Sequence, residues 1–223
     1  GRAPGTDQQT LGRALRRDPR AAENFPQDVL ELQAWLSNES PLPGVVAVPG
    51  FGTDVPLYIL GSSMFGASLA AKLGLPYSFA SHFAPEHLEQ ATTYYREHYE
   101  PSERYPEPYC IAAVNVIAAD TAEEADQQQK IVHRERVRNF IGRRGTPLSE
   151  DQLDSVVESY QGKQIVDMLR YTAKGTGTDV AEYLNWFKHH AQADELMISL
   201  QAPSHADVLR SMEILANQLE LER

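Results

Sequence analysis

The stretch Pro56–Pro76, PLYILGSSMFGASLAAKLGLP, decides the fold. It begins with a short apolar run that is typical of a buried strand, and the small residues Gly61–Ser63 then form a tight turn. An alanine-rich segment follows and ends at Gly74, a residue type that commonly stops a helix. The next run, PYSFASHF, is again strand-like. Because two parallel strands need a crossover connection, the stretch predicts one βαβ unit.

The turn between the first strand and the helix has the features of an anion site. A helix that begins at Ser63 or Met64 leaves its first N–H groups without intrahelical partners, at the partially positive end of the dipole, where phosphate commonly binds. Gly61 and Gly66 lack a Cβ and would let a ligand approach the backbone. Ser62 and Ser63 add hydroxyl donors. The alternative is that Ser63 only caps the helix.

Composition limits the classes of function. Of the 223 residues, 42% are hydrophobic and 23% are charged, as in soluble globular proteins. A formal net charge of −11 without a basic stripe argues against a nucleic-acid partner. We find no signal-peptide pattern and no apolar run of the roughly 20 residues that span a bilayer, so we expect no membrane partner and a cytoplasmic location. The single cysteine, Cys110, lies in an apolar strand-like run, which favours packing over reactivity.

Strands and helices alternate about four times along the chain. The strongest expected strand is Tyr109–Ala118, an almost continuous apolar run that indicates burial on both faces. Other expected elements are helices over Phe25–Leu36, Glu86–Tyr99 and from Thr121 to about Val137, a short strand over Val45–Val48 and a last strand over Glu195–Leu200. The alternation predicts an α/β protein with a parallel sheet. A doubly wound sheet and a (β/α)8 barrel both fit, but no GxGxxG follows a strand.

In either architecture, ligands bind at the carboxyl ends of the parallel strands. Gly61–Ser63, Ser81–Phe83 and Asp120 follow expected strands, so we expect them to converge at that edge. His82 is our candidate for a pocket residue, and Asn115 is either a core amide or a ligand contact. We find no zinc-ligand spacing among the histidines and no GxSxG motif, so we expect no metal site and identify no catalytic residue.

Five segments together resemble the bacterial luciferase-like flavin-dependent monooxygenases. They are GRAPGTDQQT, FPQDVLELQAWL, PLYILGSSMFGASLAAKLGLPYSFASHFAPE, PYCIAAVNVIAADTAEEA and ADELMI. The resemblance covers nearly the whole chain in order, and the block from GSS to SASHF is the most specific part. It implies a (β/α)8 barrel that uses reduced FMN, or in some branches a deazaflavin, together with molecular oxygen.

The resemblance also implies cofactor contacts. Arg2 matches an arginine that contacts the flavin phosphate, and Ser63 matches a serine that binds the same phosphate. Gly66 stands where some relatives carry a threonine. Gly61, Ser62 and Met64 belong to the same turn, so we assign them to cofactor binding as well.

This chain departs from the family at its beginning. The first three strands and most of the fourth would precede Arg2, and the chain starts with Gly1 rather than Met. We therefore expect a single domain over residues 1–223, an N-terminally incomplete barrel that lacks roughly its first three to four strands. Because half a barrel has open edges and an unfilled interior, we expect the isolated chain to aggregate, to be molten or to be rescued by oligomerisation.

The resemblance implies that the parent protein is a monooxygenase. It would act on a small organic substrate with molecular oxygen and with FMN reduced by a separate flavin reductase, and it allows a homodimer. One alternative is a non-catalytic flavin-binding protein of the same fold, and another is a deazaflavin-dependent oxidoreductase. A phosphosugar isomerase or aldolase is a third reading, but no lysine lies at the end of an expected strand.

Overall fold

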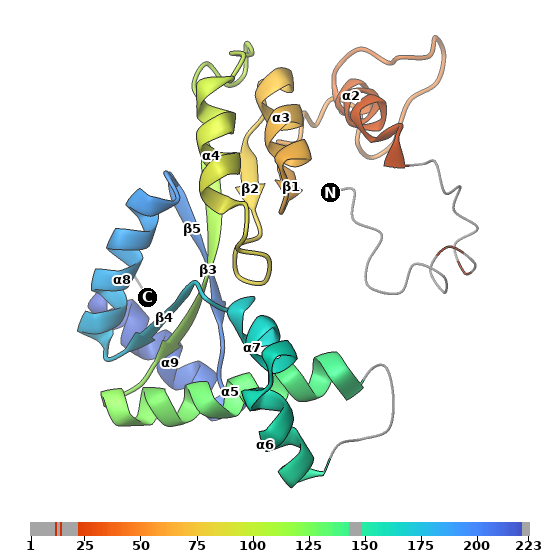
Figure 1. Cartoon of the computed structure of the whole chain (residues 1–223). Coiled ribbons are helices and arrows are strands. Elements are labelled where there is room, and N and C mark those ends of the chain that lie inside the picture. Colours follow the sequence, from red (N-terminus) through yellow and green to blue (C-terminus); the bar gives the residue numbers. More distant parts are fainter. Residues whose placement is uncertain (1–11, 13, 15–21, 143–148, 220–223) are drawn as a thin grey trace.

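Five parallel strands form one open sheet in the computed structural model, which describes residues 12, 14, 22–142 and 149–219 (Figure 1). The strands are β1 (Ile59–Gly61), β2 (Tyr77–Phe79), β3 (Cys110–Ala118), β4 (Thr172–Gly175) and β5 (Glu195–Leu200). The predicted α/β class with a parallel sheet is confirmed. The partial barrel and the single domain over 1–223 stay predictions, because the described sheet is not closed.

β3 lies in the middle of the sheet and pairs with other strands along both of its edges. One edge pairs with β5 over Ile111–Val116. The other edge pairs with β2 at Cys110–Ala112 and with β4 at Asn115–Ala118. Strands β1, β2, β3 and β5 therefore follow one another in chain order. A doubly wound sheet reverses its strand order at a switch point, and these four strands do not.

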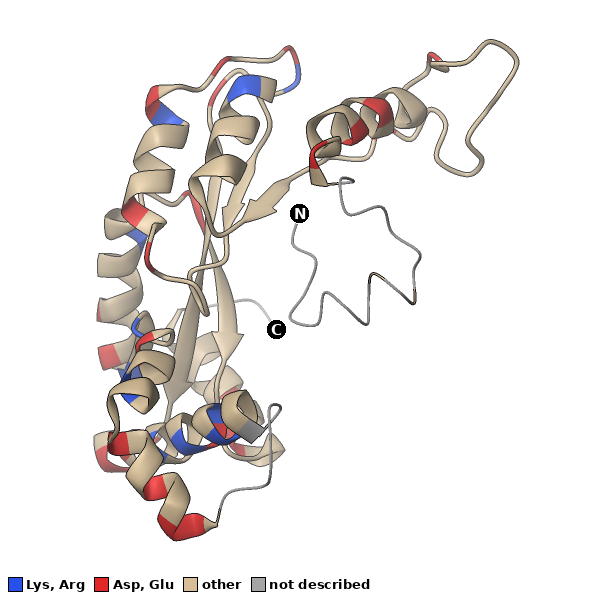
Figure 2. Ribbon diagram, turned by 45° about the vertical axis from the view of Figure 1, so that its right-hand side comes forward, with Lys and Arg blue, Asp and Glu red and all other residues tan. Residues whose placement is uncertain are grey.

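Four helices that each follow a strand cover one face of the sheet. They are α3 (Met64–Leu73), α4 (Leu88–Glu97), α8 (Gly177–His190) and α9 (His205–Gln218), and each contacts a strand. The largest fully buried side chains of this layer include Tyr77, Phe79, Leu88, Tyr95, Val114 and Phe187. Figure 2 shows the helices stacked along one side of the strands. In the part of the chain that the structure describes, no helix is both long and apolar enough to span a membrane.

The opposite face of the sheet is only partly covered by the described residues. Leu60 in β1 and Met197 in β5 alternate with side chains that pack on the helices, and they are 51% and 53% exposed. Strand side chains alternate between faces, so both point to this second face. Asn115 in β3 belongs to the same face, but it is fully buried.

A second group of helices follows β3. It comprises α5 (Ala122–Gly142), α6 (Glu150–Glu158) and α7 (Tyr160–Asp167), which pack around Val137, Leu153 and Ile165. The helix expected to end near Val137 continues to Gly142. α6 begins with a capping box, in which Ser149 and Gln152 exchange hydrogen bonds. The sequence analysis assigned no strand to Thr172–Gly175, where the structure has β4.

Residues 25–58 form an arm that extends from β1 (Figure 1). The arm contains α2 (Phe25–Leu36) and the irregular segment 37–58. The short strand expected over Val45–Val48 is wrong, because these residues pair with no strand that the structure describes. Their backbone makes local turn bonds instead, since the Val45 N–H donates to the Leu42 carbonyl oxygen and the Ala47 carbonyl oxygen accepts from the Phe51 N–H.

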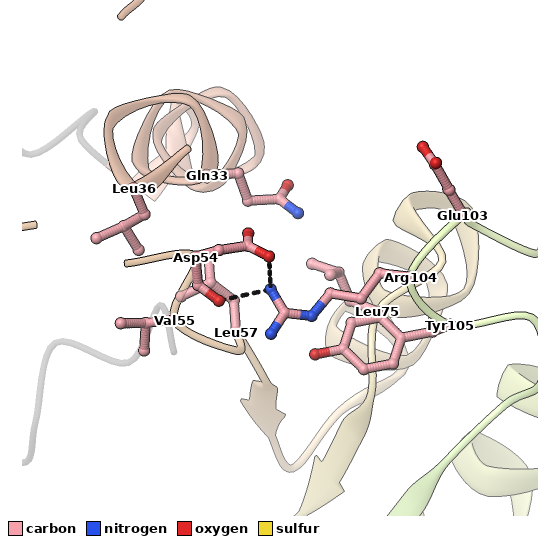
Figure 3. A pocket seen from close by; sticks show the side chains of 9 residues that line it. All are labelled: Gln33, Leu36, Asp54, Val55, Leu57, Leu75, Glu103, Arg104 and Tyr105. Atoms are coloured by element: carbon pink, nitrogen blue, oxygen red, sulfur yellow. Dashed lines mark hydrogen bonds and ion pairs between the residues drawn. The ribbon is translucent and has the colours of Figure 1, made fainter. Parts of the chain in front are cut away.

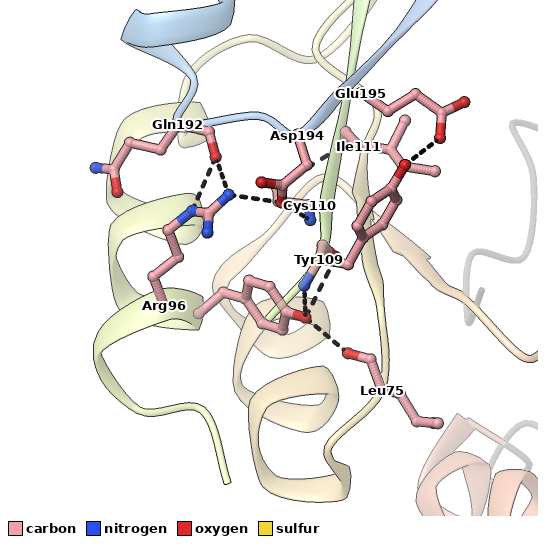
Figure 4. A network of polar contacts seen from close by, with 9 residues as sticks. Leu75, Arg96, Tyr109, Cys110, Ile111, Gln192, Asp194 and Glu195 are labelled. Atoms are coloured by element: carbon pink, nitrogen blue, oxygen red, sulfur yellow. Dashed lines mark hydrogen bonds and ion pairs between the residues drawn. The ribbon is translucent and has the colours of Figure 1, made fainter. Parts of the chain in front are cut away.

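Polar contacts join three elements at the amino-terminal end of the sheet (Figure 4). Asp194, next to β5, accepts hydrogen bonds through Oδ2 from the Cys110 backbone N–H at 2.7 Å and from Arg96 Nη2 at 2.7 Å. Arg96, on α4, also donates to the Gln192 carbonyl oxygen at 2.9 and 2.6 Å. Asp194 thus connects α4, β3 and the start of β5.

We expect Asp194→Ala to destabilise the protein by about 1–3 kcal/mol, because the Cys110 N–H and the Arg96 guanidinium both lose an acceptor. Urea denaturation measures the effect. Glu158→Ala is the matched control, since Glu158 lies 3.8 Å from Lys163 and both side chains are mostly exposed. It should cost less than about 0.5 kcal/mol. Equal losses in the two variants would contradict the role of Asp194.

The Cys110 thiol gives a second prediction. Cys110 is fully buried, and burial raises the pKa of its thiol to about 12. The thiolate is the reactive form, so the native protein should react slowly with a thiol-specific disulfide reagent at pH 8. The urea-unfolded chain should react fast, and the signal is unambiguous because the sequence has one cysteine. Rapid labelling without urea would show that β3 is accessible.

Candidate functional site

The turn after β1 leads into α3 through Ser63. Ser63 has an extended backbone conformation, with φ −147° and ψ 166°, and it occupies the N-cap position of α3. Its side chain makes no capping hydrogen bond to the helix, and the residue is exposed. Most serines at this position accept a hydrogen bond from the first turn of the helix. The Ser63 hydroxyl is therefore available to an outside ligand, next to the N–H groups of that turn.

Gly66 lets α3 pack closely on the end of β1. A Cβ atom at Gly66 would lie 3.2 Å from Tyr77 Cε2 and 3.6 Å from the Gly61 Cα. The missing side chain thus faces the core. Tyr77 also stabilises the turn, because its hydroxyl donates to the Ser63 carbonyl oxygen at 3.3 Å. Burial raises the pKa of this tyrosine above its usual range, so it stays protonated. Tyr77 is not among the residues predicted for the site, and the alternation of side chains along β2 is the signal that places it in the core.

The loop after β2 lies beside this turn. The Ala80 N–H donates to the Gly61 carbonyl oxygen at 2.9 Å, which joins the ends of β1 and β2. Ser81 is fully buried and donates to the Ala113 carbonyl oxygen at 2.5 Å. Asn115 Nδ2 donates to the His82 carbonyl oxygen at 2.7 Å. β3 therefore holds the loop in place, and the loop begins beside the end of β1. The expected convergence of Gly61–Ser63 with Ser81–Phe83 as a ligand site stays a prediction.

His82 and Asn115 each present a buried polar atom without a hydrogen-bond partner among the described residues. These atoms are His82 Nδ1 and Asn115 Oδ1. Buried polar atoms are normally satisfied, so these two atoms leave hydrogen-bonding capacity unused where β3 meets the loop after β2. Burial, and then the Arg136 guanidinium, lower the pKa of His82 below its usual value. The ring is therefore neutral at pH 7, and one ring nitrogen can accept a hydrogen bond.

Asp120 belongs to a different part of the strand edge. Arg210 on α9 contacts both of its carboxylate oxygens, with Nη2 2.5 Å from Oδ1 and Nε 3.1 Å from Oδ2. These hydrogen bonds lower the pKa of Asp120. It lies five positions after Asn115, which is about 16 Å along an extended chain. The structure thus joins Asp120 to α9, whereas Asn115 joins β3 to the loop at His82.

Met64, Ser62 and Arg2 are the other residues that the sequence assigns to cofactor binding. Met64 is the first residue of α3 and is half-buried, and Ser62 lies in the turn before it. Arg2 lies outside the described residues. No three His, Cys, Asp or Glu side chains within the ranges that the structure describes are grouped closely enough to hold a metal ion.

The chain matches known proteins along nearly its whole length. A family model described as luciferase-like monooxygenase matches residues 25–195. The Bacillus subtilis protein YvbT is 40% identical over 222 residues, which cover 97% of this chain and 65% of YvbT. A luciferase-like monooxygenase of Escherichia coli strain K12 is 39% identical over 220 residues, which cover 96% of this chain and 64% of that protein.

A solved structure is similar as well. The crystal structure of apo-MsnO8 matches with a TM-score of 0.77 at 26% identity, covering 99% of this chain and 67% of that chain. The chain spans about two thirds of the length of the curated relatives that it matches. Because the family model covers most of the chain and the sequence relatives align along nearly all of it, the chain belongs to the luciferase-like monooxygenase family.

Proposed function

We propose that this chain carries the flavin-phosphate site of a monooxygenase that uses reduced FMN and molecular oxygen on a small organic substrate. One observation carries the proposal. Ser63 begins a ten-residue helix, yet its hydroxyl makes no capping hydrogen bond. A hydroxyl and the backbone N–H groups at a partially positive helix end fit a phosphate dianion.

Three groups of this chain would hold the phosphate. They are the Ser63 hydroxyl, the first N–H groups of α3 and the neighbouring Ser62 hydroxyl. Arg2 would add a charged partner, by the resemblance of its position to the family pattern. Gly61 and Gly66 serve the site indirectly, because their close approach brings the start of α3 onto the end of β1.

The loop after β2 would form the neighbouring wall of the pocket. His82 Nδ1 and Asn115 Oδ1 are buried polar atoms that a ring edge or a substrate group could satisfy. The neutral His82 ring fits a hydrogen-bonding role better than a charged one. Bound reduced FMN would supply the electrons for oxygen chemistry, and the protein would bind, orient and exclude water.

Solved structures of the same fold point to two cofactor chemistries. A riboflavin lyase, RcaE, was solved with a modified FMN, at 15% identity and a TM-score of 0.60. A tetrahydromethanopterin reductase of Methanopyrus kandleri depends on coenzyme F420, at 12% identity and a TM-score of 0.52. We propose FMN, with a separate flavin reductase as partner, and the deazaflavin F420 is the competing ligand in each titration.

We expect Ser63→Ala to weaken FMN binding about 10-fold, since a hydrogen bond to a charged group contributes roughly 1.5–3 kcal/mol and an exposed site lies at the low end. Flavin fluorescence measures the affinity. Riboflavin lacks the phosphate, so its affinity should not change. Ser68→Ala is the control, because Ser68 is exposed on the same helix. An equal loss for FMN and riboflavin would remove the phosphate from this turn.

The activity itself requires a separate measurement on the full-length parent protein. With FMN, NADH and a flavin reductase, a substrate of the enzyme should raise oxygen consumption above the rate of free reduced FMN. The Ser63→Ala variant should reach the same rate only at higher FMN concentration. FMN binding without any substrate-dependent oxygen uptake, over a broad substrate panel, would favour a non-catalytic flavin-binding protein.

A further inference from the structure

A row of polar contacts joins one face of α4 to the chain at the end of α8. Thr93 Oγ1 accepts a hydrogen bond from Gln192 Nε2 at 2.8 Å. Arg96 donates to the Gln192 carbonyl oxygen at 2.9 and 2.6 Å (Figure 4). Glu89 Oε1 lies 3.5 Å from His190 Nε2. Residues 89, 93 and 96 share one face of the helix because they are four and three positions apart. We call this row of contacts the α4–α8 seam.

We propose that His190 makes the α4–α8 seam sensitive to pH. A protonated His190 ring attracts the Glu89 carboxylate and connects the end of α8 to the first turn of α4. A neutral ring does not, whereas the contacts of Thr93 and Arg96 involve groups that keep their protons. Histidine is the residue type whose charge ordinarily changes between about pH 5 and pH 8. The start of α4 should therefore be held more firmly at the acidic end of this range.

The geometry around Nε2 of His190 differs between the two protonation states. Nε2 lies 3.1 Å from the Tyr171 hydroxyl oxygen and 3.5 Å from the Glu89 carboxylate. Burial, and then the Glu89 carboxylate, raise the pKa of Tyr171, so its hydroxyl keeps its hydrogen throughout this range. A neutral ring can accept that hydrogen at Nε2, and its lone pair then faces the carboxylate. A proton on Nε2 turns the same atom into a donor toward Glu89.

The surroundings of the pair stabilise its charged form. His190 is the last residue of α8, at the partially negative end of that helix, and Glu89 lies in the first turn of α4, at a partially positive end. The Trp186 ring stacks on the His190 ring, with 4.8 Å between the ring centroids and 16° between the planes. The face of an indole attracts a cation. Two helix ends and one aromatic ring thus favour the ion pair once the proton is bound.

Other charged groups near the ring have different partners or face solvent. Arg170, in the segment before β4, pairs with Asp167. Lys188 and His189 belong to the last turn of α8, and both are exposed. Solvent and salt screen exposed charges strongly. Glu89 is therefore the group whose attraction to the ring changes with the proton.

The ion pair acts where the loop after β2 ends. This loop ends at His87, the residue before α4. β3 already holds the first part of the loop at Ser81 and His82. Protonated His190 would hold the other end, because Glu89 is the second residue of α4. The proton on one histidine of α8 thus controls how firmly the end of this loop is anchored.

Amide hydrogen exchange of the full 223-residue chain at about pH 5.5 and pH 8 tests the proposal. The side chains of His190 and Glu89 are 21% and 67% exposed, so the pair is a weak one. We expect protection factors, which correct for the intrinsic pH dependence of exchange, to be about 2- to 5-fold higher at the lower pH for amides 91–93. His190→Gln and Glu89→Gln should each remove the difference. His189→Gln is the matched control, because His189 is the neighbouring exposed histidine, and it should keep the difference.

The fluorescence of Trp186 reports the proton itself. The sequence has two tryptophans, so Trp35→Phe leaves Trp186 as the only indole. A protonated imidazole quenches an indole on which it stacks, so the emission should fall as the pH is lowered. Adding His190→Gln should abolish this fall. Adding Glu89→Gln should preserve it, which separates protonation of the ring from the ion pair that protonation creates.

Three results would each overturn the proposal. The first is equal protection of amides 91–93 at the two pH values. The second is a difference in protection that persists in His190→Gln or in Glu89→Gln. The third is a Trp186 emission whose pH dependence is the same with and without His190.

Discussion

The burial of β3 is the constraint on which the rest of the structure depends. All nine of its residues are buried, and it pairs with β2, β4 and β5. A strand buried on both faces must satisfy its backbone through neighbouring strands, because water is excluded. The strands on either side are short, so β3 provides most of the continuous surface against which the helices pack.

The amino-terminal and carboxyl ends of the sheet carry different polar contacts to β3. At the amino-terminal end, Asp194 ties the start of β5 to β3 and α4 through charge-assisted hydrogen bonds. At the carboxyl end, Asn115 of β3 reaches across to the His82 carbonyl oxygen. The first contact stabilises the fold. The second positions the loop that lies beside the proposed phosphate turn, so one strand serves both stability and function.

Much of the candidate site could be predicted from local sequence. The run YILGSSMFGASLAAKLGLPYSF contains the strand, the turn and the helix in one continuous segment, and each has its own start and stop residues. The rule that ligands bind at the carboxyl edge of a parallel sheet then predicted that Ser63 and His82 belong to one site. The structure shows the ends of β1 and β2 joined by the hydrogen bond from the Ala80 N–H to the Gly61 carbonyl oxygen. Asp120 illustrates the limit of that argument. It also follows a strand, but β3 is much longer than β2, and Arg210 pairs with it about 90 residues further along the chain.

The sequence by itself determined the class of fold, the βαβ unit and the family, because these depend on contacts between residues close in the chain and on a specific motif. The tertiary structure decided the features that depend on long-range pairing. β4 forms because Thr172–Gly175 meets the free edge of β3, and Val45–Val48 stays irregular because no strand that the structure describes meets it. The cavity between α2, the end of the arm and the loop before β3 likewise needs three segments that are distant in sequence (Figure 3), since no local pattern reports what their side chains enclose together.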